Sequence, residues 1–250
     1  MPTMRRLLVV NPNTSASVSA LLQQHVQAEA GLHVRVRTVT ARFGAPYIAD
    51  EASYAVAGHA TLDAWAAALA SREAEPDAVL IGCFGDPGLL ALRESSPVPV
   101  TGLAEAAFIE AARHGRFAIV TGGQRWGPML QRLAHALGHG PALAGIHTVV
   151  PTGAQLAADP VAARELLSQA CLDAVRQLGA QAVILGGAGL AGMAAQIQPS
   201  LGVPLIDSVL AGARWALRSH VLAPARETAG FDLPWQGLSP ELTALGTKPA

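Results

Sequence analysis

The chain has 250 residues, of which 51% are hydrophobic and 14% are charged, and its formal net charge is -1. This balance predicts a large buried core and excludes the basic surface of proteins that bind nucleic acid or anionic membranes. Residues 182–195 form the longest uncharged apolar stretch, which is interrupted by glycines and is too short for a membrane span. The first apolar run, LLVV at 7–10, is too short for the core of a signal peptide. We therefore expect a cytoplasmic protein with reduced thiols.

In chain order, short apolar runs alternate with helical patterns. Such alternation predicts an α/β fold with a mostly parallel sheet covered by helices. Extended segments are expected at 7–10, 33–39, 78–81, 116–123, 146–150, 182–185 and 203–207. Helical patterns follow at 17–27, 89–93, 129–138, 165–179 and 186–196.

The second half of the chain repeats the first. DAVLIGCFGDPGLLAL at 77–92 lies 104 residues before QAVILGGAGLAGMAAQ at 181–196, and three glycines coincide. The repeat predicts two similar α/β lobes, residues 1–114 with about 216–250 and residues 115–215. A ligand cleft is expected between them, at the C-terminal ends of the strands. The alternative is a chance likeness of two glycine-rich α/β segments.

The two cysteines have different surroundings. Cys171 lies on the apolar face of a predicted helix, where a cysteine behaves as a small hydrophobic residue. Cys83 ends a predicted strand and enters a glycine loop. Loop amides and a helix beginning after Pro87 predict a thiol pKa below the free value of about 8.5. On position alone, a buried structural cysteine is the simpler interpretation of Cys83.

Five stretches together resemble the aspartate/glutamate/hydantoin racemase superfamily, in particular its hydantoin and allantoin racemase branch. They are VNPNTS (10–15), GAPYIADEASYAVAG (44–58), GCFGDPGL (82–89), PVTGLAEAA (99–107) and GVPLIDSVLAG (202–212). The resemblance covers most of the chain. It implies two pseudo-symmetric Rossmann-like lobes and cofactor-independent catalysis by two cysteines that face each other across the cleft. It also implies a small-molecule substrate and a possible homo-oligomer.

The second cysteine of that pattern is absent. Gly187 stands in its place, and Gly187 is also the repeat partner of Cys83. A racemase that uses two bases needs an acid/base group on each face of the substrate carbon, and glycine supplies none. We therefore expect Cys83 to act on a hydantoin-like ring, such as a 5-substituted hydantoin, allantoin or a thiohydantoin, with racemase chemistry that is weakened or altered.

Two other roles for Cys83 stay open. As the single cysteine of a lyase, it would protonate a carbanion made by another route, such as decarboxylation. As a nucleophile, it would add to a ring carbon or double bond, or assist hydrolysis or desulfurisation of the ring. A binding protein that kept the cleft and lost the chemistry is the alternative to all the enzyme roles.

The remaining candidate residues lie in loops after the predicted strands. Asn13, Thr14 or Ser15 can cap a helix, and the loop amides there can hold a carboxylate or an imide oxygen of the substrate. Thr121 and Gly122 are expected to form an opposing carbonyl clamp, and the 186–189 loop to offer N–H donors to an enolate. Glu105 is a minor candidate for orienting the site. The other expected substrate-binding residues are Pro46, Gly82, Phe84, Gly85, Gly186, Ala188 and Gly189.

Two other site types are disfavoured. His135 and His139 have helical spacing, but Gly138 lies between them at a predicted helix end, so a solvated helix end is favoured over a metal site. The glycines at 187–192 suggest a dinucleotide loop. Asp207, near the spacing of a ribose-binding acid, lies in a predicted strand instead.

Overall fold

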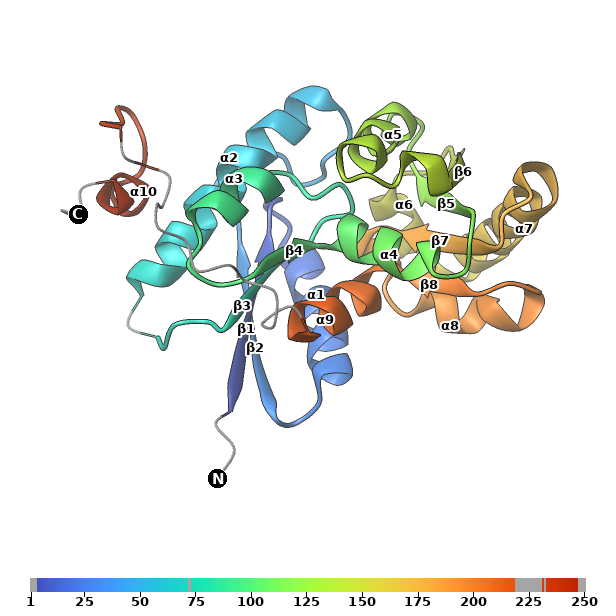
Figure 1. Ribbon diagram of the computed structural model, residues 1–250, viewed down its shortest axis with the longest axis horizontal. Coiled ribbons are helices and arrows are strands. Elements are labelled where there is room, and N and C mark those ends of the chain that lie inside the picture. The colour runs from blue at the N-terminus through green and yellow to red at the C-terminus, as the bar shows by residue number, and fades with distance from the viewer. Residues whose placement is uncertain (1–3, 72, 219–230, 232, 247–250) are drawn as a thin grey trace.

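The computed structural model describes residues 4–71, 73–218, 231 and 233–246, and within them two four-stranded parallel sheets stand side by side (Figure 1). The elements of the first half are β1 (Arg5–Asn11), α1 (Ala16–Ala30), β2 (Val34–Thr40), α2 (Glu51–Ala70), β3 (Ala78–Ile81), α3 (Leu89–Ser95), β4 (Val100–Gly102) and α4 (Leu103–Ala112). Those of the second half are β5 (Phe117–Gly122), α5 (Trp126–Ala136), β6 (Leu143–Val149), α6 (Gly153–Ala158), α7 (Pro160–Leu178), β7 (Ala182–Gly186), α8 (Met193–Ile197), β8 (Leu205–Asp207) and α9 (Ser208–Arg218). Three single-turn 3-10 helices, η1 (Gly140–Ala142), η2 (Ala188–Leu190) and η3 (Gln198–Ser200), lie in the connections, and α10 (Pro240–Leu245) is the last described helix.

The two sheets have the same topology. Their strand orders are β2-β1-β3-β4 and β6-β5-β7-β8, so each strand of the first half has a counterpart in the second. The central strands are buried on both faces, as the continuous apolar runs predict for parallel sheets: all four residues of β3 and all five of β7 are buried. The predicted α/β fold with two similar lobes is confirmed.

Alternate residues of each sheet belong to different hydrophobic clusters. On one face, Leu7 and Leu80 of the first sheet and Ile184 of the second join a single cluster shared by both halves. The opposite faces form separate clusters beneath α2 and α7, around Trp65 and Leu167. The shared cluster excludes water between the halves, so the relative position of the two sheets is set by packing.

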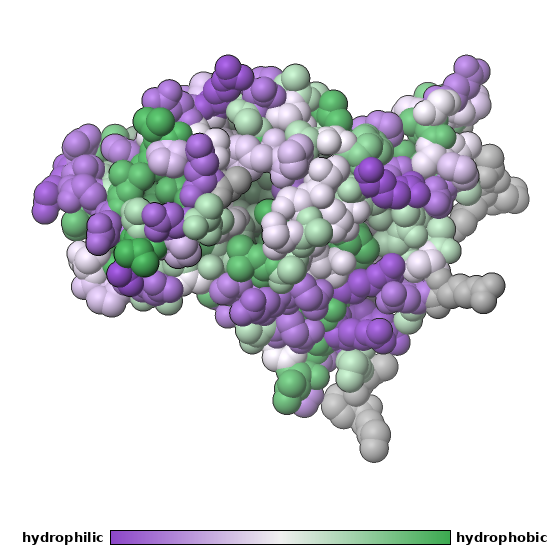
Figure 2. All heavy atoms as spheres, turned by 180° about the vertical axis from the view of Figure 1, so that it is seen from behind, coloured by the Kyte–Doolittle hydropathy of each residue, from purple (hydrophilic) through white to green (hydrophobic). Residues whose placement is uncertain are grey.

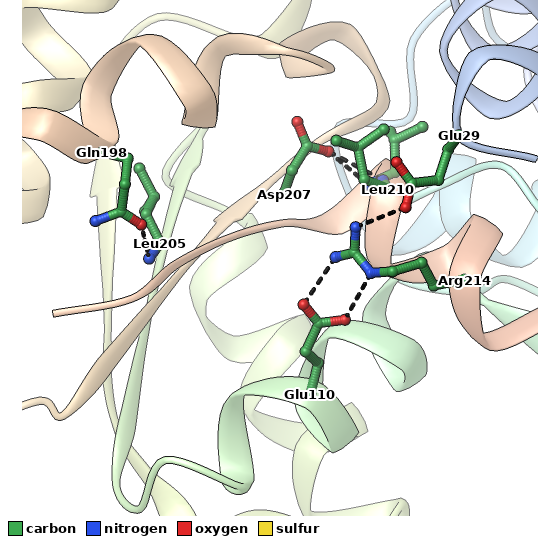
Figure 3. A network of polar contacts seen from close by, with 8 residues as sticks. Glu29, Glu110, Gln198, Leu205, Asp207, Leu210 and Arg214 are labelled. Carbon is green, nitrogen blue, oxygen red and sulfur yellow. Dashed lines mark hydrogen bonds and ion pairs between the residues drawn. The ribbon is translucent and has the colours of Figure 1, made fainter.

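The last helix of each half packs against the other half. α4 follows β4 of the first sheet but contacts β7 and β8, whereas α9 follows β8 of the second sheet but contacts α1 and β3. Arg214 of α9 joins this exchange: it donates to Glu110 of α4 at 2.7 and 3.2 Å and to Glu29 of α1 at 3.0 Å (Figure 3). The guanidinium therefore links α9 of the second half to two helices of the first half.

The described C-terminal part returns to the first half. α10 packs against α2, and Glu241 pairs with Arg42 at 3.0 Å. The predicted lobe boundaries, 114/115 and 215/216, stay a prediction, and α9 runs through the second of them without a break. Part of the segment assigned to the first lobe, residues 219–230, 232 and 247–250, lies outside the described residues.

Across the described ranges, no helix combines the length and the apolar character needed to cross a bilayer. On the face in Figure 2, hydrophobic side chains reach the surface in separate groups among hydrophilic ones.

Candidate active site

A cleft lies where the carboxyl ends of the two sheets meet. Cys83 follows β3, and Gly187 follows β7 at the equivalent position of the second sheet; both line this cleft. Its empty volume is about 810 Å³, part of it open to solvent. The sequence candidates that line it are Asn13, Ser15, Pro46, Gly82, Cys83, Phe84, Thr121, Gly122, Gly186, Gly187, Ala188 and Gly189. The structure thus brings together residues that are up to 176 positions apart in the sequence, from Asn13 to Gly189.

The cysteine side of the cleft is tightly built. The Cys83 side chain lies at the cleft wall, and the residue is only 8% exposed. The Phe84 ring packs against Gly186 so closely that a Cβ there would overlap it. Glycine at 186 therefore lets the first half contact the backbone of the second, directly beside the thiol.

The surroundings of Cys83 correct one sequence prediction. Burial raises the pKa of the Cys83 thiol above its ordinary value, and the charge of Asp86 raises it further. The expected lowering is wrong because two loop amides serve the backbone: Asp86 N–H donates to Cys83 O at 3.1 Å, and Leu89 N–H to Asp86 O at 3.1 Å. A helix does begin after Pro87, at Leu89, but desolvation outweighs its dipole. Both effects favour the neutral thiol over the thiolate.

The opposite side of the cleft has no side chain at the equivalent position. Gly187 has φ 144° and ψ 130°, a backbone conformation that residues with a Cβ rarely adopt. A Cβ built there would meet only Leu190, at 3.4 Å, which is ordinary contact. The Gly187 N–H donates to Ser208 Oγ at 3.2 Å, so this amide of the 186–189 loop is already used. Space is present at Gly187, and an acid/base group is not.

The loop after β1 presents polar groups to the cleft. Ser15 caps α1 by accepting from Val18 N–H at 3.4 Å, as predicted. Asn13 is 7% exposed, and its Oδ1 accepts from Asn11 Nδ2 at 3.0 Å and from Ser15 N–H at 2.9 Å. These bonds fix the Asn13 side chain at the wall, since a buried amide with satisfied partners has one preferred orientation.

The loop after β5 lines the same cleft. The Thr121 hydroxyl donates to Gly186 O at 2.8 Å, tying β5 to the end of β7. Beside it, Tyr47 from the first half accepts from Gly153 N–H of α6 at 3.2 Å. Thr121 and Gly122 therefore line the cleft, but the Thr121 proton is engaged by a backbone carbonyl instead of being free for a ligand.

Three of the residues predicted from the sequence do not line the cleft. Thr14 donates its amide to Ala45 O at 3.1 Å. Gly85 accepts from the Tyr54 hydroxyl at 2.7 Å. Glu105 accepts from Arg93 at 2.6 Å and from the Thr101 hydroxyl at 2.8 Å. None of the three is among the cleft-lining residues, so we interpret them as supports of the site.

Sequence reasoning missed seven cleft-lining residues, namely Ser17, Val18, Tyr47, Ile48, Trp126, Gly153 and Ala157. Tyr47 and Ile48 follow the predicted Pro46 in the stretch quoted at 44–58, so that motif could have been used to predict them. Trp126, Gly153 and Ala157 lie outside the quoted motifs, and only the packing of α5 and α6 brings them to the cleft.

The lining of the cleft is uncharged. Among the described residues that form it, the polar groups are amides, hydroxyls and one thiol, with aromatic rings from Phe84, Trp126 and Tyr47. Such a surface favours a neutral ligand with hydrogen-bonding groups over an anion. Within the same described ranges, no three His, Cys, Asp or Glu side chains are placed to hold a metal ion. The Asp207 carboxylate accepts from the amides of Gly192, Val209 and Leu210, a structural capping role and not a ribose site.

Comparisons with known proteins identify the family to which this chain belongs. The sequence model of the Asp/Glu/hydantoin racemase family matches residues 7–216. The hydantoin racemase of Paenarthrobacter aurescens is 35% identical over 214 residues, which are 84% of this chain and 89% of that protein. The solved allantoin racemase from Klebsiella pneumoniae has a TM-score of 0.86 and 32% identity, covering 98% of this chain and all of that one. The chain belongs to the Asp/Glu/hydantoin racemase family.

Proposed function

We propose that the protein is a cofactor-independent enzyme that transfers a proton at the ring carbon of a hydantoin-like small molecule, through Cys83 and from one face only. The observation that carries this proposal is the pairing of Cys83 with Gly187 at equivalent positions of one uncharged cleft. Hydantoin and allantoin racemases are among its relatives and solved neighbours, which supports this substrate class.

The ring chemistry suits a thiol. The proton on a carbon between a carbonyl and a ring nitrogen is acidic enough for a side chain to remove, and the resulting enolate can be held by hydrogen bonds. Amide and hydroxyl groups around the cleft match the carbonyl and N–H edges of such a ring. A neutral cleft binds a neutral ring without the cost of burying an unpaired charge.

A single cysteine limits the stereochemical outcome. Cys83 first loses its own proton to water in the cleft; the thiolate then removes the ring proton, and the thiol so formed returns a proton to the same face. At the position equivalent to Cys83 in the second half, Gly187 offers backbone and no side chain. We therefore expect exchange with solvent at the ring carbon to be faster than inversion, whereas two opposed acid/base groups make the two rates similar.

Incubation in D₂O tests this function. A panel of single-enantiomer 5-substituted hydantoins, allantoin and thiohydantoins is followed by NMR for deuterium uptake and by chiral chromatography for inversion. Uptake that exceeds inversion, and that is lost with Cys83→Ser, supports the proposal. Inversion as fast as uptake contradicts the one-faced mechanism. Ring opening or loss of sulfide indicates a hydrolase or desulfhydrase instead, and binding without turnover indicates a binding protein.

The neutral state of Cys83 favours a second candidate, a lyase. A buried thiol with a raised pKa is poised to donate a proton, which is what a carbanion left by decarboxylation requires. Release of CO₂ from a ring carrying a carboxylate at the reacting carbon, or from an arylmalonate, distinguishes it. Such release, with no deuterium uptake into the panel above, favours the lyase over the racemase-type enzyme.

A further inference from the structure

We infer that Asp86 is a positioning residue that keeps Cys83 in its neutral thiol form in the resting enzyme. The inference rests on the proposed role of Cys83 and extends it by assigning a carboxylate that acts together with burial to hold the thiol proton before substrate binds.

The backbone places Asp86 in the same tight loop as Cys83. Its N–H donates to Cys83 O at 3.1 Å, and its φ of 51° lies in the left-handed region. Left-handed backbone is uncommon for a residue with a side chain and is tolerated best by Asp and Asn. The turn directs the carboxylate inward, where the residue is 1% exposed.

The carboxylate is held by amides at the start of α4. Asp86 Oδ1 accepts from Ala104 N–H at 2.9 Å, and Oδ2 accepts from Glu105 N–H at 2.8 Å. The carboxylate lies against Gly102, where a Cβ would overlap it. Within the described residues it has no salt bridge to Lys, Arg or His, so the helix amides are its main compensation.

The charged and titratable neighbours add to this effect. Glu105 on α4 raises the pKa of Asp86, although its own carboxylate is paired with Arg93. Tyr54 on α2 faces the same loop, and burial raises the pKa of its hydroxyl, with a further rise from the charge of Asp86. Burial is the largest influence on both Asp86 and Cys83. A second negative charge in this loop is therefore costly, and the thiol keeps its proton.

The second half of the molecule supplies the contrast. The residue equivalent to Asp86 is Leu190, and the aspartate appears instead at Asp207, the counterpart of Gly102. From there Asp207 accepts from the first amides of α9, Val209 N–H at 2.9 Å and Leu210 N–H at 3.2 Å. Both halves thus cap the exchanged helix with an aspartate, but only the first half does so from the cysteine loop. Capping alone does not require that placement.

The pH dependence of alkylation tests the inference. Cys83 is labelled with iodoacetamide across a pH series and quantified by peptide mass spectrometry in the wild type, in Asp86→Asn and in Asp207→Asn. Asparagine keeps an acceptor for the helix amides and removes the charge. We expect the labelling midpoint of Asp86→Asn to move down by about one pH unit or more, which is roughly tenfold faster labelling below the midpoint. The matched variant Asp207→Asn is expected to keep the wild-type midpoint.

Two readouts separate charge from loosening of the structure. A looser loop speeds labelling at every pH without moving the midpoint, and Cys171 in the same samples reports general opening. If Asp86→Asn does not fold, Asp86→Ser retains a capping hydroxyl and is expected to show the same shift. An unchanged midpoint, or an equal shift in Asp207→Asn, overturns the inference. Because labelling needs no substrate, a shifted midpoint supports the role of Asp86 even if the substrate panel contradicts the proposed function.

Discussion

The two halves of this protein share a topology and differ in chemistry at the same loop. After β3 the chain carries Cys83 and Asp86; after β7 it carries Gly187 and Leu190. The first half therefore presents the Cys83 thiol, with the buried carboxylate of Asp86 in the same loop. The second half presents only backbone at Gly187, with Leu190 in the equivalent loop. The comparison teaches that a duplicated scaffold fixes where a reacting group can stand, while single residues decide whether each face of the substrate meets one.

Replacing the Cys83 thiol is expected to have the largest effect on activity, because it removes the side chain that distinguishes the first half from the second. Cys83→Ser keeps a group of similar size, but a hydroxyl is a far weaker acid and nucleophile. We expect kcat for the best panel substrate to fall by on the order of 10² or more, with little change in KM. Cys171→Ser is the matched control, because Cys171 is fully buried in the cluster beneath α7. Near-normal kcat in Cys83→Ser would leave the cleft without its proposed reacting group.

A second cysteine at position 187 would give both halves a thiol at the same loop position. Gly187→Cys is expected to raise inversion relative to exchange by about tenfold or more, because it places an acid/base group on the second face. The positive φ at Gly187 opposes this gain and is expected to cost roughly 1–3 kcal/mol of folding free energy. Gly187→Ala carries the same backbone cost without a thiol and separates the two effects by chiral analysis and thermal unfolding. If inversion rises as much in the alanine variant, the second thiol is not its cause.

The buried acid of the first half should be visible in the pH dependence of stability. Burial raises the pKa of Asp86 to about 7, so the folded protein holds this proton more tightly than the unfolded chain. The resulting stabilisation is fully present below about pH 4, the ordinary range of aspartate, and is lost as the pH rises through about 7. Asp86→Asn is expected to flatten the decline in unfolding free energy over this window, by on the order of 1 kcal/mol or more.

Urea denaturation at several pH values measures that difference. Asp63 provides a control of opposite sign, because Arg42 holds the pKa of its carboxyl below the usual range. The stabilisation from Asp63 is lost as the pH falls, so Asp63→Asn should change the acid side of the profile instead. Parallel profiles for the wild type and Asp86→Asn would mean that Asp86 ionises normally.

The smallest predicted effect concerns the bridge between the halves. Arg214→Gln removes the charged bonds to Glu110 and Glu29, and we expect a loss of about 1 kcal/mol in unfolding free energy. Arg132→Gln breaks the exposed pair with Glu51 and is expected to change stability little. Equal losses in the two variants would indicate that the Arg214 bridge has no special role in joining the halves.

Much of the scaffold could be predicted from the sequence. Apolar runs such as 78–81 and 182–185 mark buried central strands, because only strands covered on both faces tolerate unbroken hydrophobic residues. The repeat of 77–92 at 181–196 predicted matching sheets. Together with the quoted motifs, it also placed Cys83 and Gly187 in one cleft. These are local patterns of residue type, which can be recognised in the sequence without knowledge of the fold.

Tertiary structure alone decided the electrostatics and the exchanged helices. The pKa of Cys83 depends on how much water the packing of Phe84 against Gly186 excludes, and on the inward turn of Asp86. The crossing of α4 and α9 between the halves depends on which apolar face each helix buries, and two equivalent sheets offer each helix two choices. Burial and long-range packing are properties of the assembled core, so the sequence determined where the thiol stands and the fold determined its charge.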